Sequence, residues 1–222
     1  MNAPKISRRT LERLSLYRRL LSDRFAEENP FIYSHSLATL VNVTPSQVRR
    51  DIMVTGCAGN PSKGYRVSDL VMAISRLVDS DGPEPVILIG VGKLGSALID
   101  YVRTRRPHLR IVAAFDAKPM KVDRDVLGVH CHEMSELEAI ISENGVHSAI
   151  LTVPAQAAQD VANLLVKARI LGILNFAPVP LHVPTHVFVE SIDLTSSLDK
   201  VTFFARQEVE RTDLPASEDP EN

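Results

Sequence analysis

Three glycines at fixed spacing, followed by a carboxylate, are the residues of this chain most suited to chemistry. Gly90, Gly92 and Gly95 form the pattern G-x-G-x-x-G, and Asp116 follows 21 residues after Gly95. Glycines at this spacing allow a tight turn and the close approach of a pyrophosphate. A carboxylate in the position of Asp116 accepts a ribose 2′-hydroxyl and repels a 2′-phosphate. The pattern therefore predicts binding of NAD(H) in preference to NADP(H).

The elements around the glycines are those that such a site needs. The apolar run 86–89 predicts a buried parallel strand, 96–102 has a helical pattern, and the strand 111–115 leads to Asp116. The turn after Val153 should lie at the same sheet edge, because ligands bind beyond the carboxyl ends of parallel strands. The predicted cofactor-binding residues are Gly90, Val91, Gly92, Lys93, Leu94, Gly95, Asp116, Lys118, Pro154 and Ala155. A domain that binds no nucleotide, or one that binds CoA, remains an alternative.

The alternation of strands and helices continues beyond this motif. We expect strands at 129–131, 149–153, 173–176 and 187–189, with helices at 134–143 and 155–171. Strands that alternate with helices indicate a doubly wound parallel sheet of the Rossmann type. Lys118 and Lys121 lie near Asp116 and weaken the preference for NAD(H) a little.

The first 80 residues have a different pattern, typical of a winged helix-turn-helix. A helix over 7–26 ends at 27–30, and shorter helices at 34–41 and 45–54 flank the turn Asn42-Val43. Thr44 is expected to cap the helix after it, with Gln47 completing a capping box. Residues 56–67 should form a wing, and Ser68 should cap a further helix. A small helical domain that binds protein is the alternative.

The second of the two short helices would present its exposed face to DNA. Arginine can bind guanine edges through two hydrogen bonds, and glutamine can do the same with adenine. Basic residues of the wing would meet phosphates. The predicted DNA-binding residues are Ser46, Gln47, Arg49, Arg50, Lys63 and Arg66. The charge distribution agrees, since residues 1–80 carry a net charge of +5 and residues 81–222 carry −7.

Composition and missing motifs exclude several classes of protein. Of the 222 residues, 45% are hydrophobic, and no signal sequence or membrane span is present, so we expect a cytoplasmic protein. The sequence has no Tyr-x-x-x-Lys dyad and leaves no room for a substrate domain, which argues against catalysis. The alternative function is a small NAD-dependent oxidoreductase with an N-terminal interaction module. His130 and His132 have no third ligand nearby, so no metal is expected. Nothing indicates a lowered pKa for Cys57.

The C-terminal segment predicts an apolar helix that docks on another surface. Leu194, Leu198, Val201 and Phe204 follow at helical spacing after Asp193. This helix would dock on its own domain or on a partner subunit. The acidic tail 208–222 should be disordered. The expected organisation is a DNA-binding domain and linker at 1–82, a dinucleotide domain at 83–192, a dimerisation helix at 193–207 and this tail.

The order of these parts resembles the Rex family of redox-sensing transcriptional repressors over about residues 8–206. The matching segments are TPSQVRRD (44–51), GY (64–65), the glycine motif (90–95), VAAFD (112–116), VPAQAAQ (153–159), GILNFAPV (172–179) and VESIDLTSSL (189–198). The resemblance implies a homodimer that exchanges its C-terminal helix between subunits. It also implies that NADH closes the dimer and releases it from a palindromic double-stranded operator, whereas NAD+ competes and leaves the DNA-binding form accessible.

The resemblance also assigns roles to individual residues. It places Arg50 at a base-contacting position and Arg49 beside it. Arg19, Tyr101 and Asp193 match the residues of a switch that links the state of the nicotinamide to domain position, so Tyr101 joins the predicted cofactor site. The stretch 53–63 and the arginine at position 50 depart from the usual family pattern.

Overall fold

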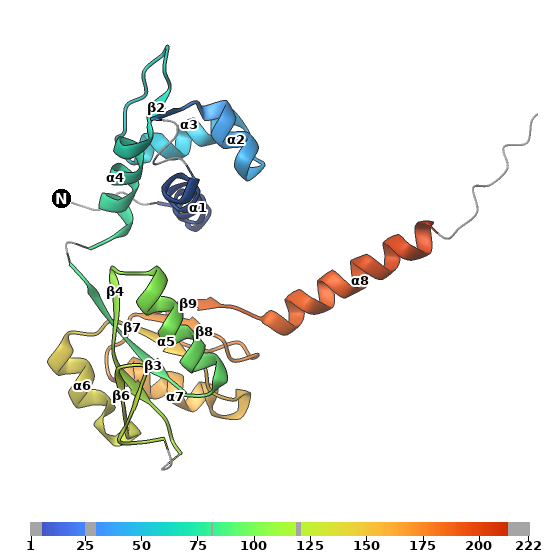
Figure 1. The fold of residues 1–222 in the computed structure, drawn as a ribbon. Helices are drawn as coiled ribbons and strands as arrows, with labels where there is room; N and C mark the ends of the chain where they lie inside the picture. Colours follow the sequence, from blue (N-terminus) through green and yellow to red (C-terminus); the bar gives the residue numbers. More distant parts are fainter. Residues whose placement is uncertain (1–5, 25–29, 81, 119–120, 213–222) are drawn as a thin grey trace, which may run out of the picture. The chain divides into compact units, whose positions relative to one another are not determined.

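The computed structural model describes residues 6–24, 30–80, 82–118 and 121–212, and the chain divides into two compact units, Met1–Gly82 and Pro83–Asn222 (Figure 1). Among the described residues, no helix has both the length and the apolar character needed to cross a membrane. Each unit has a hydrophobic core of its own.

The first unit is a small helical domain with a two-stranded sheet. Its elements are α1 (Arg8–Arg24), β1 (Phe31–Ile32), α2 (Ser34–Val41), α3 (Pro45–Val54), β2 (Tyr65–Arg66) and α4 (Val67–Val78). Strands β1 and β2 pair antiparallel, and an Asn60–Gly64 bridge narrows the loop before β2. Its fully buried side chains are Leu14, Tyr17, Leu21, Leu37, Val48, Ile52, Leu70 and Ile74.

The helices α2 and α3 have the predicted bounds, for identifiable reasons. Asn42 adopts a left-handed conformation (φ 54°) that ends α2, and the Thr44 hydroxyl accepts a hydrogen bond from the Gln47 N–H at 3.2 Å. The predicted capping box is wrong, because the Gln47 side chain bonds to Asp51 and Arg50 instead. Helix α4 begins at Val67, without a capping bond from Ser68. The predicted end of the first helix at 27–29 lies outside the described residues.

The second unit is a seven-stranded sheet with helices on both faces. Its elements are β3 (Glu84–Ile89), α5 (Lys93–Arg105), β4 (Leu109–Phe115), β5 (Arg124–Val126), β6 (Val129–His132), the 3₁₀ turn η1 (Met134–Glu136), α6 (Leu137–Asn144), β7 (Ser148–Leu151), α7 (Ala155–Lys167), β8 (Gly172–Asn175), β9 (Phe188–Ser191) and α8 (Leu194–Thr212). The strand order is β5-β6-β4-β3-β7-β8-β9, and every pairing except β5–β6 is parallel.

Alternate residues of β3 face the two sides of this sheet. Ile87 and Ile89 pack in the core with residues of α6 and α7, whereas Val86 and Leu88 pack in the core with residues of α5. A central strand covered on both faces is the mark of a doubly wound sheet. The predicted fold class is therefore confirmed for both units.

Three features of the second unit differ from the sequence-based expectation. Helix α7 ends at Lys167 rather than at residue 171, because Arg169 takes a left-handed conformation (φ 66°). Strand β5 was not predicted; it returns antiparallel to β6 through a turn at Leu127 and Gly128, both with positive φ. The predicted disorder of 208–222 is wrong for 208–212, which continue α8.

The extension of α8 has a local physical reason. Arg211 donates to Glu208 at 3.0 Å across one helical turn, and Val209 continues the apolar residues of the helix. The first residue that cannot continue a helix is Pro215. The rest of the predicted tail, 213–222, lies outside the described residues.

Candidate dinucleotide site and DNA-binding surface

The glycine loop joins the end of β3 to the start of α5. A Cβ at Gly95 would lie 2.2 Å from the Gly90 carbonyl oxygen, and a Cβ at Gly90 (φ 98°) would lie 2.7 Å from the Thr152 carbonyl oxygen. Gly92 differs, because no atom lies within 4 Å of the Cβ that it lacks. Gly90 and Gly95 are therefore needed for packing inside the chain, whereas Gly92 leaves open space beside the loop.

The start of α5 can accept an anion at this open space. Gly92 is the N-cap residue of α5, and no side chain caps the helix. The free N–H groups of a first turn and the helix dipole favour negative charge there. The pair Ile89–Leu151 brings the end of β7 beside the loop. Pro154, the N-cap of α7, and Ala155, its first residue, follow at the same sheet edge.

Asp116 directly follows β4 at this edge and is only 8% exposed. Its carboxylate accepts hydrogen bonds from the Val91 N–H (2.9 Å), the Lys118 N–H (2.9 Å) and the Lys121 ammonium (2.8 Å). Burial alone would raise the pKa of Asp116, but the bond from Lys121 and the two backbone N–H groups outweigh it, so the pKa lies below its usual range. The group is an anion that can accept a ribose hydroxyl.

Of the two lysines near Asp116, it is Lys121 whose side chain touches the carboxylate. Lys118 contributes its backbone N–H, and its side chain is exposed. A carboxylate offers about four acceptor positions, so three existing donors leave room for about one more hydrogen bond. The open space at Gly92, the uncapped α5 and the Asp116 anion together fit a dinucleotide, with its pyrophosphate at α5 and a ribose at Asp116.

The predicted DNA-binding residues of α3 lie mostly at its surface. Ser46, Arg49 and Arg50 are exposed, while Val48 and Ile52 are buried in the core. The Arg49 guanidinium donates to the hydroxyls of Ser34 and Ser46, both at 3.1 Å. Helix α3 therefore presents a basic outer face.

The wing is held in shape by its own side chains. The Asn60 amide oxygen accepts from the N–H groups of Ser62 (2.9 Å) and Lys63 (3.1 Å), and the Tyr33 hydroxyl donates to the Ser62 carbonyl (2.6 Å). The cations of Lys63 and Arg66 each lie 5.7 Å from the centre of the Phe31 ring. Both predicted wing cations are exposed and lie against one aromatic ring.

A buried carboxylate on the inner face of α3 is a further polar group that was not among the predicted site residues. Asp51 is 1% exposed and accepts from the Arg13 guanidinium (2.6 and 2.8 Å), the Tyr17 hydroxyl (2.9 Å) and the Gln47 amide (2.8 Å). Burial alone would raise the pKa of Asp51, but bonds from Arg13, Gln47 and Tyr17 outweigh it, so the pKa lies below its usual range. The one feature of the sequence that could have indicated this buried carboxylate is the position of Asp51 directly before the core residue Ile52.

The pKa values of Arg13 and Tyr17, which bond to Asp51, shift in the opposite direction. The hydrogen bond to Asp51 raises the pKa of Arg13, and burial, followed by the bond to Asp51, raises the pKa of Tyr17. Arg13 and Tyr17 belong to α1, whereas Asp51 and Gln47 belong to α3. The cluster therefore ties α3 to α1.

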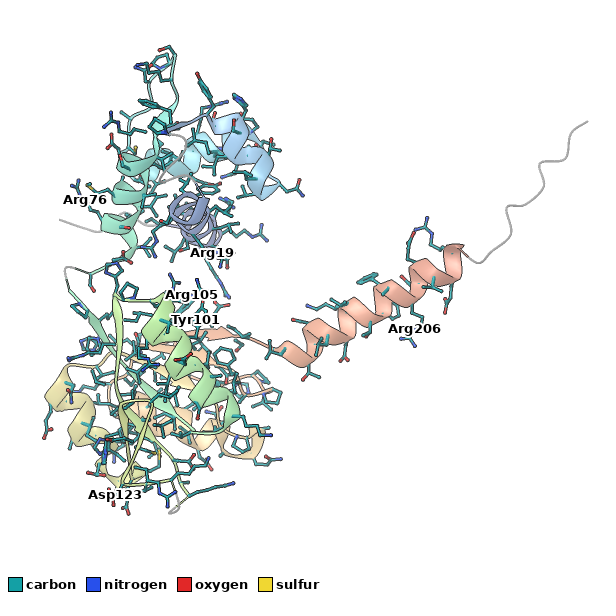
Figure 2. All side chains as sticks on the ribbon, in the orientation of Figure 1. Arg19, Arg76, Tyr101, Arg105, Asp123 and Arg206 are labelled. Carbon is teal, nitrogen blue, oxygen red and sulfur yellow. The ribbon has the colours of Figure 1, made fainter. Side chains whose placement is uncertain are left out.

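The three predicted switch residues fall on both units. Arg19 is exposed on α1 of the first unit, and Tyr101 is 52% exposed on α5 of the second (both labelled in Figure 2). Asp193 is exposed, and its Oδ1 accepts from the Ser196 N–H at 2.9 Å, so it caps the start of α8.

The remaining candidate side chains are engaged with one another. His130 contacts Asp125 at 2.9 Å, and His132 lies 3.5 Å from Glu136. Over residues 6–24, 30–80, 82–118 and 121–212, no group of three or more His, Cys, Asp and Glu is arranged to hold a metal ion. Burial raises the pKa of the Cys57 thiol, which disfavours the reactive thiolate.

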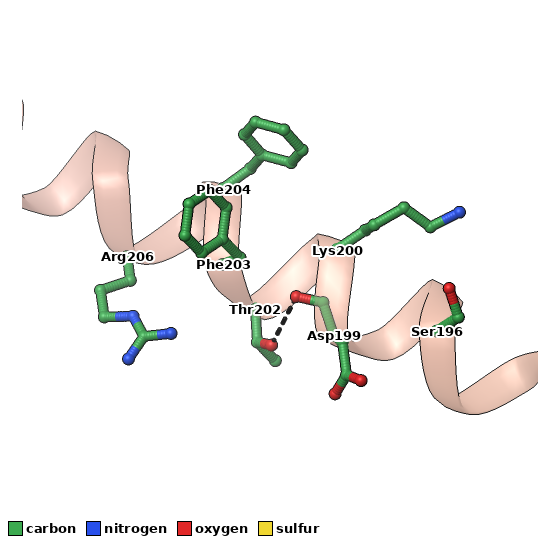
Figure 3. A pocket seen from close by; sticks show the side chains of 7 residues that line it. All are labelled: Ser196, Asp199, Lys200, Thr202, Phe203, Phe204 and Arg206. Carbon is green, nitrogen blue, oxygen red and sulfur yellow. Dashed lines mark hydrogen bonds between the residues drawn. The ribbon is translucent and has the colours of Figure 1, made fainter.

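Helix α8 exposes an apolar surface. The close view in Figure 3 shows Phe203 and Phe204 projecting from this helix. Its exposed apolar side chains are Leu194, Leu198, Val201, Phe203, Phe204 and Val209. An apolar surface of this kind marks an interaction site.

The two units together define a class: a regulator with a helix-turn-helix unit and a dinucleotide-binding unit. Residues 5–52 match the family model "putative DNA-binding protein N-terminus", and residues 81–179 match the model "CoA binding domain". The chain is 40% identical to the redox-sensing transcriptional repressor Rex of Geobacillus sp. (strain WCH70), covering 90% of this chain and 93% of the relative. It is 40% identical to Rex of Syntrophobacter fumaroxidans, covering 91% and 97%. The chain belongs to the Rex family of redox-sensing transcriptional repressors.

Solved structures of the Rex-family repressor RSP have the same fold. RSP in complex with NAD+ and operator DNA is 29% identical, covers 96% of this chain and 99% of its own, and superposes with a TM-score of 0.85. RSP in complex with NADH is also 29% identical, covers 94% and 98%, and gives a TM-score of 0.81.

Proposed function

We propose that this protein is a DNA-binding repressor that responds to the ratio of NADH to NAD+. The single observation that carries the proposal is the combination of two sites in one chain: the open glycine loop with its Asp116 anion, and the basic outer face of α3 with its wing. RSP was crystallised once with NAD+ and operator DNA and once with NADH, which supports the binding of a nicotinamide dinucleotide and of DNA by the present chain, its relative. The protein is a regulator and not an enzyme.

The cofactor would be held by main-chain and side-chain groups of one sheet edge. The loop Gly90–Gly95 and the start of α5 would bind the pyrophosphate, and Asp116 would accept a ribose hydroxyl, with Lys118, Tyr101, Pro154 and Ala155 completing the site. Gly92 leaves the space that a close approach requires. When bound, the nicotinamide supplies a ring that is cationic when oxidised and neutral when reduced.

The operator would be bound by Arg50 and Arg49 of α3, by Ser46, and by Lys63 and Arg66 of the wing. Two such units in a homodimer would read a palindrome, because dimer symmetry requires two half-sites. The exposed apolar side chains of α8 support this assembly, with the helix exchanged between subunits. We place the protein in the cytoplasm and assign 1–82 to DNA binding, 83–192 to the cofactor and α8 to dimerisation.

Arg19, Tyr101 and Asp193 would connect the two activities. A charged pair favours different geometries beside a cationic and a neutral nicotinamide. Asp193 uses Oδ1 to cap α8, so its second oxygen can accept from an arginine without uncapping the helix. NADH would thereby close the dimer and release the operator, and NAD+ would leave the DNA-binding form accessible.

The test is a fluorescence anisotropy titration on duplexes selected by the protein from a random pool. We expect selection of a palindrome, release by NADH and restoration by NAD+. Specific DNA binding that NADH leaves unchanged would refute the proposal that the protein senses NADH. Release by CoA in place of NADH would favour the ligand named by the family model for residues 81–179. Absence of specific binding would refute the repressor.

A further inference from the structure

Gln47 lies on α3 between a buried carboxylate and an exposed arginine. Its amide nitrogen donates to Asp51 at 2.8 Å, and its amide oxygen accepts from the Arg50 guanidinium at 3.1 Å. An ionised carboxylate only accepts hydrogen bonds, so the NH2 group must face Asp51 and the oxygen must face Arg50. The orientation of the amide is therefore fixed by the protein.

We propose that Gln47 reads no base but positions Arg50, so that Asp51, on the buried face of the same helix, sets the base preference of Arg50 through Gln47. This proposal rests on the proposed function, because it assumes that α3 binds operator DNA. It makes Gln47 and Asp51 positioning residues for recognition, where the residue types alone suggested that Gln47 contacts adenine.

The hydrogen-bond partners of Gln47 carry this assignment. A two-bond contact with adenine needs the amide oxygen and an N–H together, and it discriminates between bases by roughly 5- to 150-fold. Gln47 would have to release or share its bond to Arg50 to make it. Its other bond goes to a buried charge, and a hydrogen bond to a charged group is worth about as much as the base contact. Gln47 is also half-buried.

Arg50 has the opposite properties. It is exposed, and a guanidinium carries five N–H donors, of which one goes to Gln47. The remaining donors are enough for the two bonds that an arginine makes with guanine O6 and N7. Holding one edge of the guanidinium limits its rotation, so the other edge is presented to the base in one orientation.

The path behind Gln47 leads to α1. Asp51 is held by the Arg13 guanidinium and by the Tyr17 hydroxyl, at distances of 2.6 to 2.9 Å. With four donors on one carboxylate that is 1% exposed, Asp51 has little freedom to turn. A rigid acceptor on the inner side makes Gln47 a rigid support for Arg50.

The experiment is a double-mutant cycle with Gln47→Ala, Arg50→Ala and the combination. The probe is a fluorescein-labelled duplex carrying the sequence that the wild-type protein selects from a random pool, with each base pair then replaced in turn. We expect Gln47→Ala to weaken discrimination, by about tenfold, at the same G·C pair that Arg50→Ala relaxes. The double variant should then be no weaker than Arg50→Ala alone.

Other outcomes would overturn the proposal. Relaxed discrimination at a separate A·T pair with additive losses would make Gln47 a base reader, and unchanged discrimination at every pair would leave it without a role. A wild-type protein that selects no sequence would overturn the proposed function and this inference with it.

A second variant tests the part played by Asp51, and its folding is checked separately. Asp51→Asn can donate as well as accept, so the Gln47 amide is free to turn over. We expect this variant to relax the preference at the pair that Arg50 reads, while thermal melting shows a folded protein at the assay temperature. Ser68→Ala, at an exposed position of α4 outside α3 and the wing, is the matched control and should keep the wild-type preference.

Discussion

Alanine at Gly92 and alanine at Gly95 should have different consequences, although both glycines belong to one motif. A Cβ at Gly95 would lie 2.2 Å from the Gly90 carbonyl oxygen, 3.0 Å from the Thr152 hydroxyl and 3.2 Å from Leu88. A contact of about 3.4 Å is needed, so α5 must move by about 1 Å from β3. A Cβ at Gly92 would meet nothing within 4 Å.

The magnitudes follow from these contacts. Overpacking in a core costs about 1–3 kcal/mol, and Gly95→Ala should reach the upper part because the obstacle is backbone. A loss of 1 kcal/mol lowers the melting temperature of a unit of this size by about 4 °C, so the melting temperature of Gly95→Ala should fall by roughly 8–12 °C. Gly92→Ala should change the free energy of unfolding by no more than about 0.5 kcal/mol, as expected of a surface substitution.

Binding should separate from stability in this pair. The Cβ of Gly92→Ala fills the space that a pyrophosphate would use, so NADH affinity should fall by about 100-fold or more, since each lost bond to a charged group is worth about 1.5–3 kcal/mol. Gly95→Ala should lose both affinity and stability. Thermal unfolding and NADH fluorescence titration measure the two effects.

Two results would refute the reasoning. Wild-type NADH affinity in Gly92→Ala would show that the pyrophosphate does not approach the loop at this position. An unchanged melting temperature in Gly95→Ala would show that α5 and β3 are not packed as closely as the 2.2 Å approach requires.

Three further predictions concern other parts of the chain. Asp51→Asn should lower the free energy of unfolding by about 3 kcal/mol at pH 7. Because folding lowers the pKa of Asp51, this difference in unfolding free energy between variant and wild type should shrink as the pH falls below about 4, which urea titrations at several pH values measure. Asp116→Ala should weaken the binding of NADH by about 10- to 100-fold and the binding of NADPH by less, as measured by fluorescence titration. Equal losses of affinity for the two dinucleotides would contradict the assignment of Asp116 to the ribose. Leu198→Glu with Phe204→Glu should convert a dimer to a monomer in sedimentation, while Lys200→Glu should not; a dimer that survives the double change would exclude α8 from the interface.

Local signals predicted the helices and turns that carry the two candidate sites because each of these elements is built from neighbouring residues. The αL conformation of Asn42 and the cap at Thr44 fix the bounds of α2 and α3, and both are visible as residue types. The glycine loop and Asp116 likewise follow directly from the ends of two strands. Chemistry that depends on a turn beside an element is accessible to sequence reasoning.

Contacts between distant segments could not be predicted in the same way. The Asp51 cluster joins residues that are 34 and 38 positions apart, and no periodicity marks the pairing of Arg13 with Asp51. The same limit applies to Gln47, whose residue type suggests a base contact until its partners are known. The end of α7 at Lys167 was not predicted, because the left-handed conformation of Arg169 has no signature in the sequence.

The edge strands of the seven-stranded sheet are β5 and β9. At one edge, β5 is three residues long, antiparallel, and carries the exposed charges of Arg124 and Asp125. A short charged edge strand is a poor template for a further strand, so it opposes the edge-to-edge pairing that leads to aggregates. The hairpin that closes it, through the turn at Leu127 and Gly128, is therefore a solubility device: it blocks growth of the sheet at that edge.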